Sequence, residues 1–385
     1  MNIAIIDADL IGRSKHRFPN LVCMKLSAYY KAQGHDVQLV TNYDDLDYFD
    51  KIFISKVFTD TYVDETILKL PNVEYGGTGF FYDKAPKLLD DIEHHMPDYH
   101  LYDEWVDKQV QSGAKKKDFV YYTEYSIGFL TRGCFRQCSF CVNKNYKKCE
   151  QHSHISEFMD ESRPKLCFLD DNFFACPHWK NIIAEVKATS KRFQFKQGLD
   201  ERLLTDDKIH ELMSWSYDGD YIFAFDNIAD KDIITSKLQR IRELYPDTKK
   251  HFKFYVFCGY DRNDVWDEQF WHDDIRDLFE RIRILASYKA IPYVMRFNKC
   301  YESKYAGVYS TVAAWCNQPS IFHKFSYREY CMCKGMGDKN YAKYKRDFDK
   351  YLAEVGTKGA AWRYMEECEQ IFPDIAETYF DDTTE

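Results

Sequence analysis

The segment Thr131–Cys141 constrains this chain more than any other part of its sequence. It carries three cysteines, Cys134, Cys138 and Cys141, at the spacing C-x-x-x-C-x-x-C. Three thiolates on one short loop can bind three irons of a [4Fe–4S] cluster, because protein thiolates hold such clusters. The fourth iron then lacks a protein ligand, so a small molecule with an amine and a carboxylate can chelate it. The loop therefore predicts an open-sided iron–sulfur cluster.

Two other interpretations of these cysteines are possible. They could be small buried apolar residues, or ligands of a structural zinc ion. Zinc prefers a closed tetrahedron built from pairs of cysteines or histidines. No second cysteine pair follows at the usual distance, and the nearest histidines are His152 and His154. The spacing favours the cluster.

The composition narrows the class of protein. The 385 residues suffice for one large or two medium domains. The chain has no apolar run of about 18 residues, and its start, Met1–Asp7, lacks the basic region of a signal peptide. Its 13 cysteines show no paired pattern, which suits a reducing compartment. We therefore expect a cytoplasmic protein without membrane contact, and the net charge of −9 gives no general reason to expect nucleic-acid binding.

Residues 1–110 are predicted to form a Rossmann-like, doubly wound α/β domain. Short apolar runs at Ile3–Ile6, Val37–Val40 and Ile52–Ser55 are typical of buried parallel strands. A helical pattern lies between the first two and ends at Gly34. A fourth strand runs into a glycine-rich turn within Val73–Gly79. The polar stretch from Pro97 to Asp118 is expected to be a connector.

Strands and helices alternate again from residue 120. Six segments predict strands: Tyr125–Leu130, Leu166–Leu169, Phe193–Lys196, Tyr221–Phe225, Lys253–Phe257 and Ile291–Phe297. The clearest helical face comprises Ile275, Leu278, Phe279, Ile282 and Leu285. This alternation predicts a partial (β/α)6 barrel over residues 120–300, with reacting groups at the carboxyl ends of its strands. Residues 301–385 are expected to form a helical C-terminal extension, with a frayed tail at Phe380–Glu385.

Over residues 120–300 the chain resembles the radical S-adenosylmethionine (radical SAM) superfamily. The resemblance rests on the cysteine loop, on Asp170-Asp171-Asn172 after the second strand of this region, and on the stretch from Gly198 to Leu203 after the third. It implies a [4Fe–4S] cluster on Cys134, Cys138 and Cys141. It also implies cleavage of SAM to a 5′-deoxyadenosyl radical that takes a hydrogen atom from a substrate. An electron donor such as flavodoxin or ferredoxin would be a partner.

The same resemblance implies residues that contact SAM. They are Phe140 near the adenine, Asp170, Asp171 and Asn172 at the methionyl amine, Arg202 at the carboxylate, Asp226 at the ribose or amine, and Gly259 against the adenine. A guanidinium fork suits a carboxylate, and an amine benefits from carboxylate or carbonyl neighbours. Several of them also have a plainer interpretation: core packing for Phe140, a capped turn for the Asp-Asp-Asn triplet, a surface ion pair with Asp206 or Glu201 for Arg202, and a turn glycine at Gly259.

The N-terminal domain resembles the cobalamin-binding domain that precedes many radical SAM domains. Asp7–Gly12 takes the place of that domain's D-x-H-x-x-G loop, and Gly76, Gly77 and Gly79 take the place of its later glycine-rich turn. Asp9 stands where the cobalt-ligating histidine would be. Either cobalamin binds without a histidine on its lower face, or this B12-binding-like domain has lost the cofactor and serves as a scaffold.

Other residues give weaker indications. Cys258, near the expected rim, is a candidate hydrogen-atom donor to a substrate radical. An auxiliary cluster would need Cys300, Cys316, Cys331 and Cys333, but their spacing favours burial instead. The basic and aromatic segment His323–Tyr330, with the lysines between 334 and 350, could contact RNA, although a solvated helical face is commoner.

Two rival functions remain open. One is a cobalamin-dependent radical SAM methyltransferase. The other is a non-catalytic iron–sulfur or zinc protein that binds RNA or a protein partner. A methylthiotransferase is disfavoured, because Cys23 alone in the N-terminal region cannot hold a second cluster. Nothing in the sequence identifies the substrate.

Overall fold

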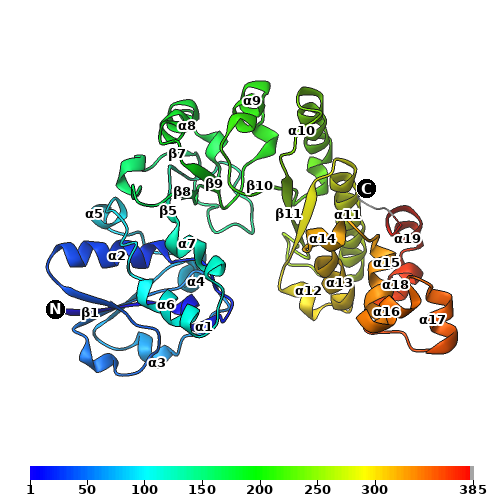
Figure 1. Ribbon diagram of the computed structural model, residues 1–385, viewed down its shortest axis with the longest axis horizontal. Coiled ribbons are helices and arrows are strands. Elements are labelled where there is room, and N and C mark those ends of the chain that lie inside the picture. Colours follow the sequence, from blue (N-terminus) through cyan, green and yellow to red (C-terminus); the bar gives the residue numbers. More distant parts are fainter. Residues whose placement is uncertain (382–385) are drawn as a thin grey trace. The chain divides into compact units, whose positions relative to one another are not determined.

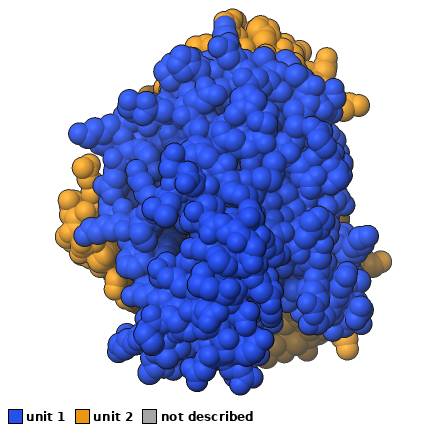
Figure 2. Space-filling view, turned by 90° about the vertical axis from the view of Figure 1, so that its left-hand side faces the viewer, with its two compact units in different colours: residues 1–197, 215–218 blue, residues 198–214, 219–385 orange. Residues whose placement is uncertain are grey.

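The computed structural model describes residues 1–381 (Figure 1). It is a mixed α/β structure with parallel sheets and many helices. The chain divides into two compact units, shown in blue and orange in Figure 2. Unit 1 comprises residues 1–197 with 215–218, and unit 2 comprises residues 198–214 with the chain from 219 onward. The predicted domain limits at 110–120 and 300 fall within these units and stay predictions.

The first sheet of unit 1 is parallel, as expected, and contains the four predicted strands. They are β1 (Asn2–Asp7), β2 (Asp36–Leu39), β3 (Lys51–Ser55) and β4 (Val73–Gly76), in the spatial order β2-β1-β3-β4. Ile3 and Ile5 pack on one face of the sheet and Ala4 and Ile6 on the other, and all four are buried. The strand order reverses at β1, so the carboxyl end of β1 is the switch point where sheets of this kind bind ligands.

Helix α2 (Leu21–Ala32) packs on the face that carries Ile3 and Ile5. The Asn20 side chain caps its first turn by accepting hydrogen bonds from the backbone amides of Val22 and Cys23. Gly34 follows its end with a φ of +82°, as the sequence predicted. The remaining short elements around this sheet are α1 (Ala8–Gly12), α3 (Glu65–Leu68), α4 (Thr78–Phe81), α5 (Asp90–Glu93), and the 3₁₀ turns Leu46–Tyr48 and Tyr82–Lys84.

The expectation of a connector between residues 97 and 118 is wrong. Residues Asp103–Gln111 form helix α6, followed by the 3₁₀ turn Lys116–Phe119 and by α7 (Val120–Thr123). Tyr99, Leu101, Tyr102 and Val106 are buried in the same core as the strand β1. The sequence interpretation rested on the polar residues of this stretch, whereas most of its apolar side chains belong to the core that contains Ile3 and Ile5.

A second parallel sheet in unit 1 contains β5 (Tyr125–Gly128), β8 (Lys165–Phe168) and β9 (Arg192–Phe195), in that spatial order. Its core is aromatic, with Phe168, Phe193 and Phe195 packed against Trp215 or one another. Two short strands, β6 (Thr131–Arg132) and β7 (Glu150–Gln151), pair antiparallel beside it. The other elements are α8 (Trp179–Ala188) and the 3₁₀ turns Ile155–Glu157 and Phe173–Ala175.

Unit 2 contains the last three predicted strands, β10 (Tyr221–Ala224), β11 (Phe252–Cys258) and β12 (Ile291–Arg296), in a parallel sheet of that order. Its helices include α9 (Asp206–Ser214), α10 (Lys231–Leu244) and α11 (Glu268–Ser287), with 3₁₀ turns at Glu201–Leu203 and Ile228–Asp230. The predicted apolar face of α11 is buried. All six strands predicted after residue 120 are therefore present. Their closure into one partial barrel stays a prediction.

The expected C-terminal extension is helical. It comprises α12 (Lys299–Glu302), α13 (Ala306–Cys316), α14 (Pro319–Phe322), α15 (Tyr327–Met336), α16 (Asp338–Tyr344), α17 (Phe348–Glu354), α18 (Ala360–Ile371) and α19 (Pro373–Tyr379). The frayed tail was predicted too early, because Phe380 is fully buried and its carbonyl accepts a hydrogen bond from the Arg328 amide. Residues 382–385 of that prediction lie outside the described part. Within residues 1–381, none of the helices combines the length and the apolar character needed to cross a membrane.

Candidate functional site

The cysteine loop is closed at its base by a strand pair. Thr131 pairs with Gln151 and Arg132 with Glu150, so residues 133–149 form one excursion from β6 to β7. Gly133 begins it with a φ of +95°, and a Cβ at this position would lie 2.4 Å from the Lys148 carbonyl oxygen. Only glycine permits this close approach. The sequence therefore needs a glycine immediately before its first cysteine.

The three predicted metal ligands are partly exposed thiols on this loop. The backbone amide of Arg136 donates to the Cys134 sulfur at 3.4 Å, and that of Asn143 donates to the Cys141 sulfur at 3.4 Å. N–H groups directed at sulfur stabilise negative charge there, and such bonds tune iron–sulfur clusters. The local geometry therefore suits thiolate ligands.

Asp170, at the carboxyl end of β8, supports the strand that leads into the loop. Its carboxylate accepts hydrogen bonds from the amides of Leu130 (3.0 Å) and Thr131 (2.7 Å) and from the Thr131 hydroxyl (2.6 Å). The side chain is fully buried, and burial raises the pKa of Asp170 to about 7. Both oxygens therefore hold the chain immediately before the cysteines.

Asp171 and Asn172 extend the same support into the loop. The Asp171 carboxylate accepts from the Gly133 amide at 2.8 Å and from the Asn143 side-chain amide. Burial raises the pKa of Asp171, and the Gly133 amide partly offsets this effect. The side-chain amide of Asn172 donates to the Cys134 sulfur at 3.3 Å. The triplet thus contacts the beginning of the loop, one of its cysteines, and a residue just after the last cysteine.

This supporting role was missed in the sequence, which suggested only a SAM-binding triplet or a capped turn. A signal was present: three consecutive polar residues at the end of a buried strand face the neighbouring strand's end in a parallel sheet. The predicted contacts of Asp170, Asp171 and Asn172 with SAM stay predictions, as does that of Phe140.

The fit of a cluster to this loop rests on its donor set. Three thiols lie within eight residues, two of the sulfurs receive N–H groups, and the loop is anchored at both ends. Over residues 1–381, no three His, Cys, Asp or Glu side chains are arranged around one point in the manner of a single-ion site. A cubane cluster spreads its ligands more widely than one ion does, so the donor chemistry is the relevant test.

In unit 2, Arg202 is held by two ion pairs. Its Nε lies 2.7 Å from Asp200 Oδ1, and its Nη1 lies 2.8 Å from Asp230 Oδ2. The plainer interpretation foresaw an ion pair, although with Asp206 or Glu201 as partner. Asp226, after β10, accepts from the Phe257 amide at 3.0 Å, and burial raises its pKa. The SAM contacts predicted for Arg202 and Asp226 stay predictions.

Gly259 and Cys258 lie at the carboxyl end of β11. Gly259 has a φ of +76°, and a Cβ there would lie 2.1 Å from the Cys300 sulfur, so packing alone accounts for a glycine. Its amide donates to Asp274 at 2.9 Å. Cys258 is buried, and its thiol donates to the Met295 carbonyl at 3.5 Å. The neighbouring Cys300 thiol, together with burial, raises the pKa of Cys258. The adenine and hydrogen-donor roles of the two residues stay predictions.

The cysteines considered for an auxiliary cluster, Cys300, Cys316, Cys331 and Cys333, are all buried, as the preferred interpretation expected. Several side chains of His323–Tyr330, the segment considered for RNA contact, are buried or form ion pairs within the chain. Tyr327 and Tyr330 are buried, and Arg328 forms ion pairs with Glu369 and Asp381. These contacts support a packed helical face.

The residues at the N-terminal switch point make contacts within the chain. Asp9, at the position of the expected histidine, is buried, and its carboxylate accepts from the Val57 amide at 2.6 Å and from the Thr61 hydroxyl. A Cβ on Gly77 would lie 2.2 Å from the Lys56 carbonyl oxygen. The backbone of Lys56, just after β3, therefore fills the space beside Gly77 that the missing side chain leaves. Both interpretations of this domain, cobalamin bound without a histidine ligand and loss of the cofactor, stay predictions.

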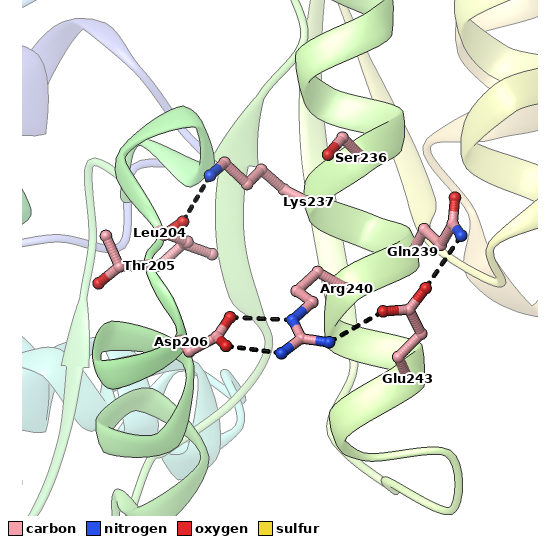
Figure 3. Close-up of a pocket in the computed structure, with 8 residues that line it drawn as sticks. All are labelled: Leu204, Thr205, Asp206, Ser236, Lys237, Gln239, Arg240 and Glu243. Carbon is pink, nitrogen blue, oxygen red and sulfur yellow. Dashed lines mark hydrogen bonds and ion pairs between the residues drawn. The ribbon is translucent and has the colours of Figure 1, made fainter.

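A surface pocket of about 320 Å³ lies in unit 2 between the start of α9 and α10 (Figure 3). Arg240 spans it, with one end of its guanidinium on Asp206 (2.6 and 2.9 Å) and the other on Glu243 (3.0 Å). Lys237 donates to the Leu204 carbonyl at 2.7 Å. None of the predicted site residues lines this pocket, and the charges of Asp206, Arg240 and Glu243 are paired with one another.

Glu201 is a buried acid that the sequence interpretation considered only as an ion-pair partner of Arg202. It is 1% exposed, and within residues 1–381 neither carboxylate oxygen accepts a hydrogen bond of good geometry, although the backbone amides of Glu201 and Ala224 act weakly to lower its pKa. Burial, with a smaller contribution from the Asp200 charge, raises the pKa of Glu201 to about 8. A carboxyl group with this surrounding is held in its neutral form at neutral pH.

The raised pKa predicts how stability depends on pH. Between about pH 4.5 and 8 the folded chain keeps a proton on Glu201 that the unfolded chain releases. The free energy of unfolding therefore falls with rising pH across this window, by up to about 1.4 kcal/mol per pH unit. We expect Glu201→Gln to remove the part of this slope that comes from Glu201, as measured by urea unfolding at pH 5 and pH 8, whereas the part that comes from Asp170, whose pKa burial also raises, stays. The exposed Asp207→Asn is the control, and an equal slope in wild type and Glu201→Gln would contradict the assignment.

No protein-family model matches the chain, and neither does any curated protein sequence. Among solved structures, the chain is similar to the cobalamin-dependent S-adenosylmethionine radical enzyme OxsB with aqua-cobalamin bound, at 12% identity and a TM-score of 0.33, over 95% of this chain and 56% of that one. The apo, selenomethionine-labelled form of OxsB gives 11% identity and a TM-score of 0.35, over 97% and 61%. The chain spans less than two thirds of these structures, and a likeness at this level carries no functional argument.

Proposed function

We propose that this protein is a radical SAM enzyme that abstracts a hydrogen atom from a substrate. One observation carries the proposal: three partly exposed thiols on a single loop, with backbone N–H groups at two of the sulfurs, held by acidic and amide side chains from the end of the next parallel strand. Three protein thiolates leave one corner of a [4Fe–4S] cluster without a protein ligand.

In this proposal the chain's own residues prepare the loop. Cys134, Cys138 and Cys141 would hold a [4Fe–4S] cluster which, when bound and reduced, supplies the electron that cleaves SAM to methionine and a 5′-deoxyadenosyl radical. Asp170 and Asp171 hold the loop's backbone at its entry, and Asn172 orients Cys134. The residues that keep their proposed roles as SAM contacts are Phe140, Asp170, Asp171, Asn172, Arg202, Asp226 and Gly259. Flavodoxin or ferredoxin is the proposed electron donor.

The experiment is anaerobic reconstitution of the purified chain with iron and sulfide, followed by dithionite and SAM. We expect a [4Fe–4S] signature in the electron paramagnetic resonance spectrum of the reduced protein, and 5′-deoxyadenosine among the products by mass spectrometry. A protein that binds only zinc and forms no 5′-deoxyadenosine would support the non-catalytic rival instead.

The cobalamin-dependent methyltransferase is the less favoured rival. Asp9 is engaged with Val57 and Thr61, and Lys56 fills the space beside Gly77. The same reconstituted protein tests it, because bound cobalamin would add a visible absorption band.

A further inference from the structure

A turn of the N-terminal region reaches the cysteine loop of the same unit. It is the 3₁₀ turn Tyr82–Lys84, which directly follows α4. The Tyr82 hydroxyl donates to the carbonyl oxygen of Phe140, between the second and third cysteines. The Asp83 carbonyl accepts from the side-chain amide of Asn145 at 3.0 Å, and the Asp83 carboxylate lies 3.2 Å from Lys144 Nζ. The turn thus contacts the loop at three points.

The glycine-rich turn after β4 positions this contact. Gly77 has a φ of +104° and lies against the Lys56 carbonyl, which leaves no space for a side chain. The amide of Gly79 donates to the same carbonyl at 2.9 Å. Helix α4 is therefore fixed to the end of β3 by backbone contacts. Tyr82 then has a φ of +49°, a conformation that non-glycine residues adopt rarely and that its contacts must hold.

The contact complements the support from the Asp-Asp-Asn triplet. Asp170 and Asp171 hold the start of the loop and Asn143, whereas the turn holds Phe140, Lys144 and Asn145. The Cys141 amide also donates to the Cys138 carbonyl at 2.9 Å, so these two ligands share one tight turn, and Phe140 lies within it. A restraint on the Phe140 carbonyl therefore acts on the backbone between two ligands.

We propose that Tyr82–Lys84 is a positioning arm, through which the N-terminal sheet region holds the Cys138–Cys141 half of the loop ready to receive its cluster. This deepens the proposed function and rests on it. The glycine-rich turn then has a structural role other than cofactor binding, because its contacts with Lys56 fix α4, and Tyr82–Lys84 directly follows α4. Tyr82 and Asp83 are positioning residues, because they act through Phe140, Lys144 and Asn145.

The test compares Tyr82→Phe, which removes a single hydroxyl, with the matched control Tyr75→Phe. Both tyrosines are 38% exposed, and Tyr75 stacks on Phe81 instead of contacting the loop. The first measurement is amide hydrogen exchange of residues 138–146 in the iron-free chain. The second is the rate at which a chelator removes iron from the reconstituted protein. We expect both rates to rise by about fivefold in Tyr82→Phe, the effect of one lost hydrogen bond, and to stay unchanged in Tyr75→Phe.

Asp83→Asn is the second variant, because it removes the charge that faces Lys144 and keeps the carbonyl that Asn145 contacts. It is expected to change both rates in the same direction as Tyr82→Phe. If wild type binds a cluster and neither variant changes either rate, the arm is overturned while the proposed function stands. If wild type binds no cluster, the proposed function fails, and the hydrogen exchange of the iron-free chain still decides whether the turn restrains the loop.

Discussion

The Cys138→Ala variant is expected to lose its cluster, and the rate of SAM cleavage is expected to fall about 100-fold or more. Mutation of residues that only orient metal ligands already lowers metal affinity or activity by about 10–100-fold. Three protein thiolates are the smallest set that holds three corners of the cluster, and no other cysteine lies on this loop before Cys149. The measurements are iron bound per chain after anaerobic reconstitution and 5′-deoxyadenosine formed under dithionite.

Cys149→Ala is the matched control for that variant. Cys149 ends the same excursion but is 3% exposed, and burial raises the pKa of its thiol to about 12. A thiol with so high a pKa is a poor metal ligand, so this variant should keep its iron and its SAM cleavage. Equal iron binding by Cys138→Ala and wild type would remove the loop from consideration as a cluster site.

In the Asp170→Ala variant, the free energy of unfolding of the iron-free chain is expected to fall by about 3 kcal/mol or more. Its carboxylate accepts three hydrogen bonds in a fully buried position, and removing it leaves the Leu130 and Thr131 donors without an acceptor. Each buried donor left unsatisfied costs about 1–3 kcal/mol. Because these donors lie just before the cysteines, the variant should also bind less iron.

Urea unfolding of the iron-free chain measures the first effect, and iron content after reconstitution measures the second. Asp91→Ala, an exposed carboxylate removed from α5 of the same unit, is the control and should change neither. If Asp170→Ala unfolded at the same urea concentration as wild type, Asp170 would not support the loop, and only its proposed contact with SAM would remain.

Much of the fold could be predicted because its signals are local. The ten expected strands are present, since each shows in its own residues either a short apolar run or an alternation of apolar and polar residues, or runs into a glycine-rich turn. The apolar face of α11 and the position of Gly34 follow from helical periodicity and from backbone conformation. The predictions were wrong where a mostly polar segment packs into the core. Helix α6 consists mainly of polar residues, yet its Val106 is buried, and Phe380 is buried although it follows the last helix.

The candidate site was predicted in part for the same reason. Residue type and spacing on one loop were enough to single out three thiols, and position after a strand was enough to single out Asp170, Asp171 and Asn172. Which atoms those side chains contact could not be predicted, because Thr131 and Asp170 are 39 positions apart and Tyr82 and Phe140 are 58 apart. One sequence contains no measure of contacts over such separations.

The sequence by itself determined which groups are present and in what order: three candidate sulfur ligands on one loop and a glycine before the first of them. It also determined an alternation of strands and helices that forms parallel sheets. Only the tertiary structure decided what holds that loop in place. Strand pairing brings the end of β8 beside the loop's entry, and close backbone contact at Gly77 carries Tyr82 to Phe140. Burial then sets the protonation of Asp170 and Glu201, since a carboxyl group removed from water resists ionisation, and at Glu201 this effect outweighs the opposing charge of Arg202.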